Sequence, residues 1–102
     1  MRTRDQAAVI DRAKVVDICK RNDISYLGVF GSYARGDFNA ESDVDVLVRF
    51  TKGKSLLDLV RIERELAERV GRPIDLVTED SVSPYLKDRI VAQVKGIYER
   101  EG

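Results

Sequence analysis

The chain has 102 residues, which is enough for one modest hydrophobic core, and we expect residues 1–102 to form a single domain. The charges of its 18 basic and 18 acidic residues cancel. This argues against stable binding of DNA or RNA, because proteins that bind a long polyanion usually carry a surplus of basic residues. The chain contains no histidine, so Ser-His-Asp hydrolysis, histidine–zinc sites and histidine-dependent ribonuclease chemistry are excluded within it. A lone cysteine, no apolar signal core and no apolar run of membrane-spanning length together predict a cytoplasmic protein without a membrane partner.

The first half of the chain predicts one helix and two strands. Apolar residues recur at helical spacing between Arg4 and Arg21, with charges between them. The nearly continuous apolar run Ile24–Phe30 predicts a strand buried on both faces. The segment Ser42–Phe50 alternates, and we expect a second strand with its three valines on one side and its two aspartates on the other.

The second half predicts a helix, a strand and a last helix. Ser55 and Asp58 indicate a helix start, and Gly71 stands where a helix ends. A third strand is expected at residues 73–78, and Ser83-Pro84 opens a helix. The long excursion between the second and third strands could be a crossover, so we predict an α/β protein of the α+β type, with helices on a small mixed sheet. The last helix is expected to face the core with Leu86, Ile90, Val94 and Ile97.

Three aspartates on predicted strands are the first candidate site. Asp43 and Asp45 are two residues apart and point the same way, and Asp75 lies in the third predicted strand. Two carboxylates about 6 Å apart repel by on the order of 3 kcal/mol at an effective dielectric near 20, and a divalent cation would offset this. Mg²⁺ fits best because it prefers carboxylate and phosphate oxygens. An isolated Asp-x-Asp pair is, however, more often found at a solvated strand edge.

A glycine and a serine after the first strand are the second candidate site. Gly31-Ser32 is followed by a plausible short helical turn, whose free N–H groups and serine hydroxyl would bind an anion. Arg35, one turn on, could bind a phosphate tail with its planar fork. The alternative interpretation is an ordinary turn with a serine N-cap, in which Arg35 pairs with Asp37.

The two candidate sites together are more specific than either alone. Gly31-Ser32 is separated by ten residues from Asp43-Val44-Asp45, and Asp75 follows on a later strand. This pattern resembles the DNA polymerase beta-like nucleotidyltransferase superfamily, and most of all the stand-alone minimal nucleotidyltransferases of prokaryotic toxin–antitoxin pairs. The resemblance covers residues 24–98, and the segment 84–90 looks like the last helix of that family.

The resemblance implies a polymerase beta-like palm fold and a role for each motif residue. Asp43, Asp45 and Asp75 would be catalytic and would ligate Mg²⁺, with two ions expected, and Asp75 would also help to deprotonate the acceptor. The nucleotide would be ATP, held by Gly31 and Ser32 with help from Arg35. The chain departs from the family pattern at Tyr33, where many relatives carry a basic residue, and part of the phosphate affinity is therefore in doubt.

The resemblance also implies an activity and a partner. The chain would be an antitoxin that transfers AMP to a tyrosine hydroxyl of a HEPN-family ribonuclease toxin and so neutralises it. Two alternatives stay open at this point. The chain could be a non-catalytic antitoxin that only masks the toxin, or the catalytic subunit of an antibiotic-type, small-molecule nucleotidyltransferase.

Overall fold

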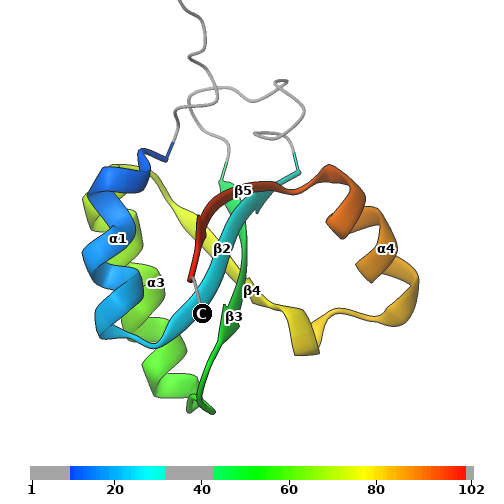
Figure 1. Cartoon of the computed structure of the whole chain (residues 1–102), viewed down its shortest axis with the longest axis horizontal. Helices are drawn as coiled ribbons and strands as arrows, with labels where there is room; N and C mark the ends of the chain where they lie inside the picture. The colour runs from blue at the N-terminus through cyan, green and yellow to red at the C-terminus, as the bar shows by residue number, and fades with distance from the viewer. Residues whose placement is uncertain (1–9, 32–42, 101–102) are drawn as a thin grey trace, which may run out of the picture.

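The computed structural model describes residues 10–31 and 43–100. Three α-helices, four strands and a short 3-10 helix are described within these ranges (Figure 1). None of the described helices is both long and apolar enough to cross a lipid bilayer. In chain order the elements are α1 (Arg12–Arg21), β2 (Ile24–Phe30), β3 (Val44–Phe50), α3 (Leu56–Val70), β4 (Ile74–Thr78), η2 (Glu79–Ser81), α4 (Pro84–Gln93) and β5 (Lys95–Glu99).

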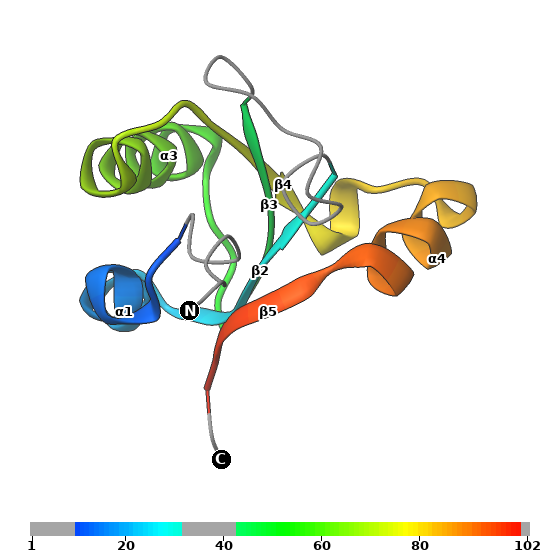
Figure 2. The same cartoon turned by 90° about the horizontal axis from the view of Figure 1, so that it is seen from above.

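The strands form one mixed sheet in the order β4-β3-β2-β5. β2 is antiparallel to both β3 and β5, whereas β3 and β4 are parallel. A parallel pair needs a crossover connection, and α3 provides it. α1 and α3 lie on one side of the sheet and α4 stands on the other (Figures 1 and 2). The predicted mixed sheet with helices packed on it is confirmed.

The main core lies between the sheet and the α1–α3 layer. Val44, Val46 and Val48 are fully buried in it, as the alternation of the second strand predicts. Leu47 is also buried but is not part of this cluster, because its side chain points to the opposite face of the sheet. The helices contribute Val15, Ile18, Cys19, Ile62 and Leu66 to the cluster.

The ends of α3 follow the signals in its sequence. The backbone N–H of Asp58 donates to Ser55 Oγ, and the backbone N–H of Ser55 donates to Asp58 Oδ2, each over 3.1 Å. This reciprocal capping box satisfies two N–H groups that the helix itself leaves without partners. Gly71 then ends the helix with a left-handed φ of 82°. Both predicted ends of this helix are confirmed.

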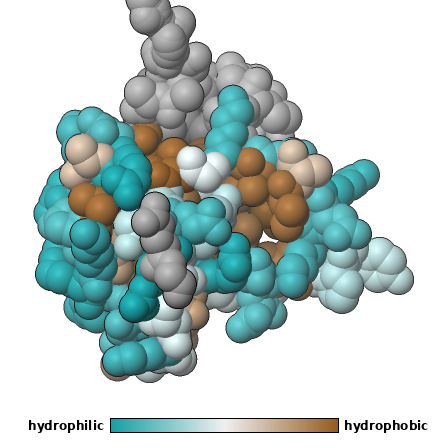
Figure 3. Space-filling model, viewed as in Figure 1, coloured by the Kyte–Doolittle hydropathy of each residue, from teal (hydrophilic) through white to brown (hydrophobic). Residues whose placement is uncertain are grey.

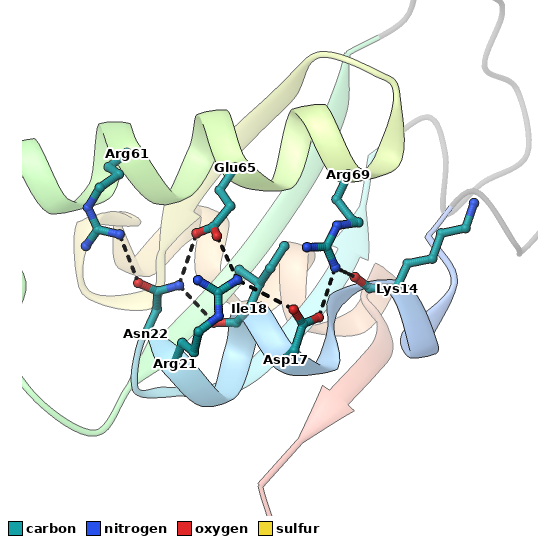
Figure 4. A network of polar contacts seen from close by, with 8 residues as sticks. All are labelled: Lys14, Asp17, Ile18, Arg21, Asn22, Arg61, Glu65 and Arg69. Carbon is teal, nitrogen blue, oxygen red and sulfur yellow. Dashed lines mark hydrogen bonds and ion pairs between the residues drawn. The ribbon is translucent and has the colours of Figure 1, made fainter.

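A polar network fixes α1 against α3 (Figure 4). The buried Asn22 donates from Nδ2 to Ile18 O over 2.9 Å and to Glu65 Oε1 over 3.3 Å, and its Oδ1 accepts from Arg61 over 3.2 Å. Arg21 forms an ion pair of 2.8 Å with Glu65. The contacts with Arg61 and Glu65 join residues about forty positions apart, so they set the orientation of the two helices.

Three predicted boundaries need correction. α1 begins at Arg12, because Asp11 is its N-cap and accepts from Ala13 N over 3.0 Å, and the predicted start at Arg4 lies outside the described residues. β3 begins at Val44, so Asp43 directly precedes the strand and is not inside it. Ser42 lies outside the described residues. β4 begins at Ile74, after a proline that has no N–H to donate to a strand partner.

The prediction for the last helix is also wrong, because this helix ends before Val94 and a strand follows it. α4 stops at Gln93 and buries none of its residues. Val94 adopts an extended backbone, and Ile97 lies in β5, an edge strand that the sequence did not predict. The apolar spacing from Leu86 to Ile97 fits a helix locally, but the open edge of β2 takes residues 95–99 as its pairing partners. The expected core face of the last helix is therefore not formed.

Candidate active site

Asp45 and Asp75 are direct neighbours across the parallel pair β3–β4, where their Cα atoms are register partners. Val44 and Val46 flank Asp45, Ile74 flanks Asp75, and all three belong to the core under α1 and α3. Because side chains alternate along a strand, both aspartates point to the face opposite those helices. Asp75 is exposed and Asp45 is half-buried. Neighbouring strands are about 4.8 Å apart, so the two carboxylates share one small area of the sheet.

Asp43 lies at the same end of the sheet. It is exposed and stands two positions before Asp45. The next residue, Val44, already donates its backbone N–H to Pro73 O over 2.9 Å, which places Asp43 at the point where β3 and β4 begin to pair. Within residues 10–31 and 43–100, no three histidine, cysteine, aspartate or glutamate side chains are gathered as a metal site. The structure thus brings together Asp45 and Asp75 and puts Asp43 near them.

Gly31 lies against the carboxylate of Asp45. It follows β2 with a φ of 75°, directly after Phe30, whose register partner is Asp45. A Cβ atom on Gly31 would overlap Asp45 Oδ2 and would lie 3.2 Å from Asp45 Cγ. Glycine is therefore required here for two reasons: the left-handed backbone and the space that the carboxylate occupies. Ser32, Tyr33 and Arg35, which complete the predicted phosphate site, lie outside the described residues.

The donors at this end of the sheet suit a hard divalent cation. Asp45 and Asp75 offer carboxylate oxygens from adjacent strand positions, and Mg²⁺ is commonly held by one or two carboxylates together with substrate phosphates. Sulfur and imidazole ligands are not found at these positions. The residues present therefore fit the metal that the sequence predicts.

Sequence reasoning missed how Tyr26 lies on the same face of the sheet. Gly28 and Gly96 are register partners on β2 and β5. A Cβ atom on Gly28 would lie 2.7 Å from Tyr26 Oη, and one on Gly96 would lie 3.4 Å from it, so the ring covers both glycines. The guanidinium of Arg49 stands 5.0 Å from the ring centre, and burial raises the pKa of the Tyr26 hydroxyl. A glycine inside an apolar strand was the available signal for this close approach.

Two surface hollows lie away from the aspartates. One of about 550 Å³ is found where β3 and β4 end, around Lys54 and Thr78, and one of about 600 Å³ lies between α1 and β5, around Arg12 and Tyr98. Neither is lined by Gly31, Asp43, Asp45 or Asp75. The candidate site therefore lies outside both of these hollows.

Comparison with known proteins identifies a family and relatives of this chain. The family model described as "Polymerase beta, Nucleotidyltransferase" matches residues 13–102. A candidate protein adenylyltransferase of Methanocaldococcus jannaschii is 45% identical over 80 residues, which are 78% of this chain and 86% of the relative. The protein adenylyltransferase MntA of Thermococcus cleftensis is 33% identical over 94 residues, which are 92% of this chain and 95% of the relative.

A solved structure shares the fold at lower sequence identity. It is a tri-AMPylated HEPN toxin of Shewanella oneidensis in complex with its MNT antitoxin, and the match has a TM-score of 0.68 at 22% identity. The alignment covers 93% of this chain and 73% of the matched one. With the family match over most of the chain and the paired aspartates on adjacent strands, this chain belongs to the polymerase beta nucleotidyltransferase family.

Proposed function

We propose that this chain transfers AMP from ATP to a tyrosine hydroxyl of a HEPN-family ribonuclease toxin and thereby acts as its antitoxin. The observation that carries the proposal is the pairing of Asp45 with Asp75 next to the Gly31 backbone. Relatives named as protein adenylyltransferases, and a neighbour whose complex holds an AMPylated toxin, support it. We propose that residues 1–102 form one minimal catalytic domain and that the acceptor hydroxyl belongs to the partner protein.

In the proposed reaction each site residue has one task. Asp43, Asp45 and Asp75 would hold two Mg²⁺ ions, which supply charge neutralisation at the transferring phosphoryl group. Gly31 and Ser32 would bind the triphosphate with their backbone and hydroxyl groups, and Arg35 would bind its tail.

The transfer itself is an in-line displacement. The tyrosine oxygen attacks the α-phosphorus, the new O–P bond forms, and the bond from the α-phosphorus to the bridging oxygen breaks as pyrophosphate leaves. A phenol has a pKa of about 10 and needs a base at neutral pH, so we assign its proton to Asp75. Asp75 is exposed, which leaves its carboxylate accessible to an incoming hydroxyl.

A second candidate function is an antitoxin that binds and masks its toxin without catalysis. An ATP-dependent modification assay separates the two functions, because masking needs neither ATP nor the aspartates.

The test uses a HEPN-type protein, which the proposal expects to be encoded next to this chain, together with ATP and Mg²⁺, followed by intact-mass spectrometry of the partner. We expect AMP on a partner tyrosine, and we expect Asp45→Asn to slow its appearance by at least about 100-fold, a loss comparable to removing a key electrostatic group at other active sites. Asp80→Asn is the matched control, because Asp80 is an exposed aspartate beyond the opposite end of β4.

Three outcomes decide between the candidates. Neutralisation without any adduct, unchanged in Asp45→Asn, would favour masking. Label on an added aminoglycoside-type substrate, and none on the partner, would favour a small-molecule nucleotidyltransferase. Equal rates for Asp45→Asn and Asp80→Asn would remove Asp45 from the reaction.

A further inference from the structure

The helix α4 presents an apolar stripe that this chain does not bury. Leu86 and Ile90 are four residues apart and lie on one side of the helix, and Val91, next to Ile90, extends this apolar surface around the helix. Leu86 is 51% exposed and Val91 is 52% exposed, and no residue of α4 is buried. We call these three residues the α4 stripe. Helices of ten residues are marginal by themselves and are usually stabilised by packing of their apolar side, so the α4 stripe needs a partner surface.

The position of α4 relates the stripe to the candidate active site. α4 stands on the side of the sheet opposite α1 and α3, in both views (Figures 1 and 2), and Asp45 and Asp75 point to that side. The end of α4 is fixed to this face, because a Cβ atom on Gly28 would lie 2.6 Å from Val94 Cγ2. Figure 3 shows apolar surface on the face turned to the viewer, between the sheet and α4.

We propose that the α4 stripe is the surface on which the acceptor protein docks. The inference rests on the proposed function, since a transferase whose acceptor is a protein must hold that protein on the side where the reacting carboxylates point. The acceptor would cover Leu86, Ile90 and Val91 with an aliphatic surface of its own. Lys87, Asp88 and Arg89 are exposed around the stripe and would form the polar rim usual for such interfaces.

A second copy of this chain is a less suitable occupant. A copy seated on α4 would stand beside Asp45 and Asp75 and would obstruct an incoming tyrosine, whereas the acceptor itself has to be there. Asp75 is exposed, so a protein docked on α4 would cover its carboxylate and exclude water from it. Exclusion of water strengthens every electrostatic interaction in the site.

The chain contains a matched control surface. Leu56 and Leu57, at the start of α3, are 76% and 81% exposed and are therefore more accessible than the α4 stripe. They follow the end of β3, whereas the aspartates lie at its beginning, so they are found at the opposite end of the sheet (Figure 1). A protein docked at that end would not bring a hydroxyl to Asp75.

The experiment compares two double variants, Leu86→Ala/Val91→Ala and Leu56→Ala/Leu57→Ala. Isothermal titration with the HEPN-type protein measures the Kd for the partner. A second titration, with Mg²⁺ and a non-hydrolysable ATP analogue, measures nucleotide binding. The rate of AMP transfer is measured at a limiting concentration of the partner. We expect the α4 variant to raise the Kd for the partner by about 30-fold or more, as truncation of central interface residues does. Nucleotide affinity should stay within about twofold of wild type, and the α3 variant should match wild type in every assay.

Failure of this inference differs from failure of the proposed function. If wild type transfers AMP and the α4 variant binds and modifies the partner as well as wild type does, the docking surface is elsewhere. If the α4 variant changes only self-association in sedimentation equilibrium, a second copy is the occupant and the inference is overturned. If wild type transfers no AMP but the α4 variant still loses partner binding, the docking surface stands and the transferase proposal fails.

Discussion

The two faces of the sheet differ in burial and in the residues that they carry. The face under α1 and α3 holds a continuous apolar cluster, and a polar network around Asn22 fixes the two helices to each other. The opposite face carries Asp45 and Asp75, the ring of Tyr26 over two glycines, and a helix that buries nothing. The first face supplies the stability of the fold. The second is less completely buried and carries acidic groups together with exposed apolar surface.

Loss of volume on the helix-covered face should give the largest effect on stability. Leu66 is 1% exposed in the main core, and Leu66→Ala should lower the free energy of unfolding by about 2–5 kcal/mol, as a cavity in a packed core does. Leu86→Ala, on the exposed α4, should change it by less than about 0.5 kcal/mol. Urea unfolding of both variants measures the difference. Similar losses would mean that α4 contributes to the folded core.

A comparison of two glycines isolates the active-site end of the second face. Gly31 and Gly71 have φ values of 75° and 82°, so alanine is strained at both positions, by about 1–2 kcal/mol. Only Gly31 has a neighbour in the way, since nothing lies within 4 Å of a Cβ atom on Gly71. We therefore expect both variants to lose stability by a similar amount from backbone strain. Gly31→Ala should lose more in total, because its Cβ also displaces Asp45.

The decisive readout for the glycine pair is AMP transfer at a temperature where both variants are folded. Gly31→Ala should lower the transfer rate at least tenfold, because a displacement of about 1 Å in a catalytic group is costly, whereas Gly71→Ala should transfer at the wild-type rate. Equal rates for the two variants would show that the position of Asp45 beside Gly31 does not matter for the reaction.

The smallest expected effect is an acid dependence of the α1–α3 contact. The hydrogen bond from Arg69 holds the pKa of Asp17 below its ordinary value of 3.8. A carboxyl group whose pKa is lower in the folded state contributes stability above pH 4, and this contribution is lost as the pH falls through the folded pKa. Asp17→Asn should therefore unfold with a weaker pH dependence below pH 4 than wild type. Thermal melts between pH 2.5 and pH 6 would show this, and parallel curves for the two proteins would contradict it.

Local signals accounted for much of the fold. The capping box of Ser55 and Asp58, the left-handed Gly71 and the apolar run of β2 each act within a few residues, so their effects can be read without knowledge of the rest of the chain. The same reasoning failed for the end of the chain, from Val94 onward. The spacing of its apolar residues fits a helix, but the open edge of β2 pairs with residues 95–99 and makes them a strand. This strand pairing depends on which edge of the sheet the rest of the fold leaves open.

The candidate site likewise has features that the sequence predicted and features that only the tertiary structure decided. The sequence by itself determined the family and the candidate residues, because Gly-Ser and three aspartates at that spacing resemble a family pattern, and the family match agrees with the family that they indicate. Only the tertiary structure decided that Asp45 is the register partner of Asp75, that Gly31 leaves room for the Asp45 carboxylate, and that α4 stands unburied on the same side. The reason is physical: strand register and helix docking are settled by contacts between residues far apart in the chain, where local spacing carries no information.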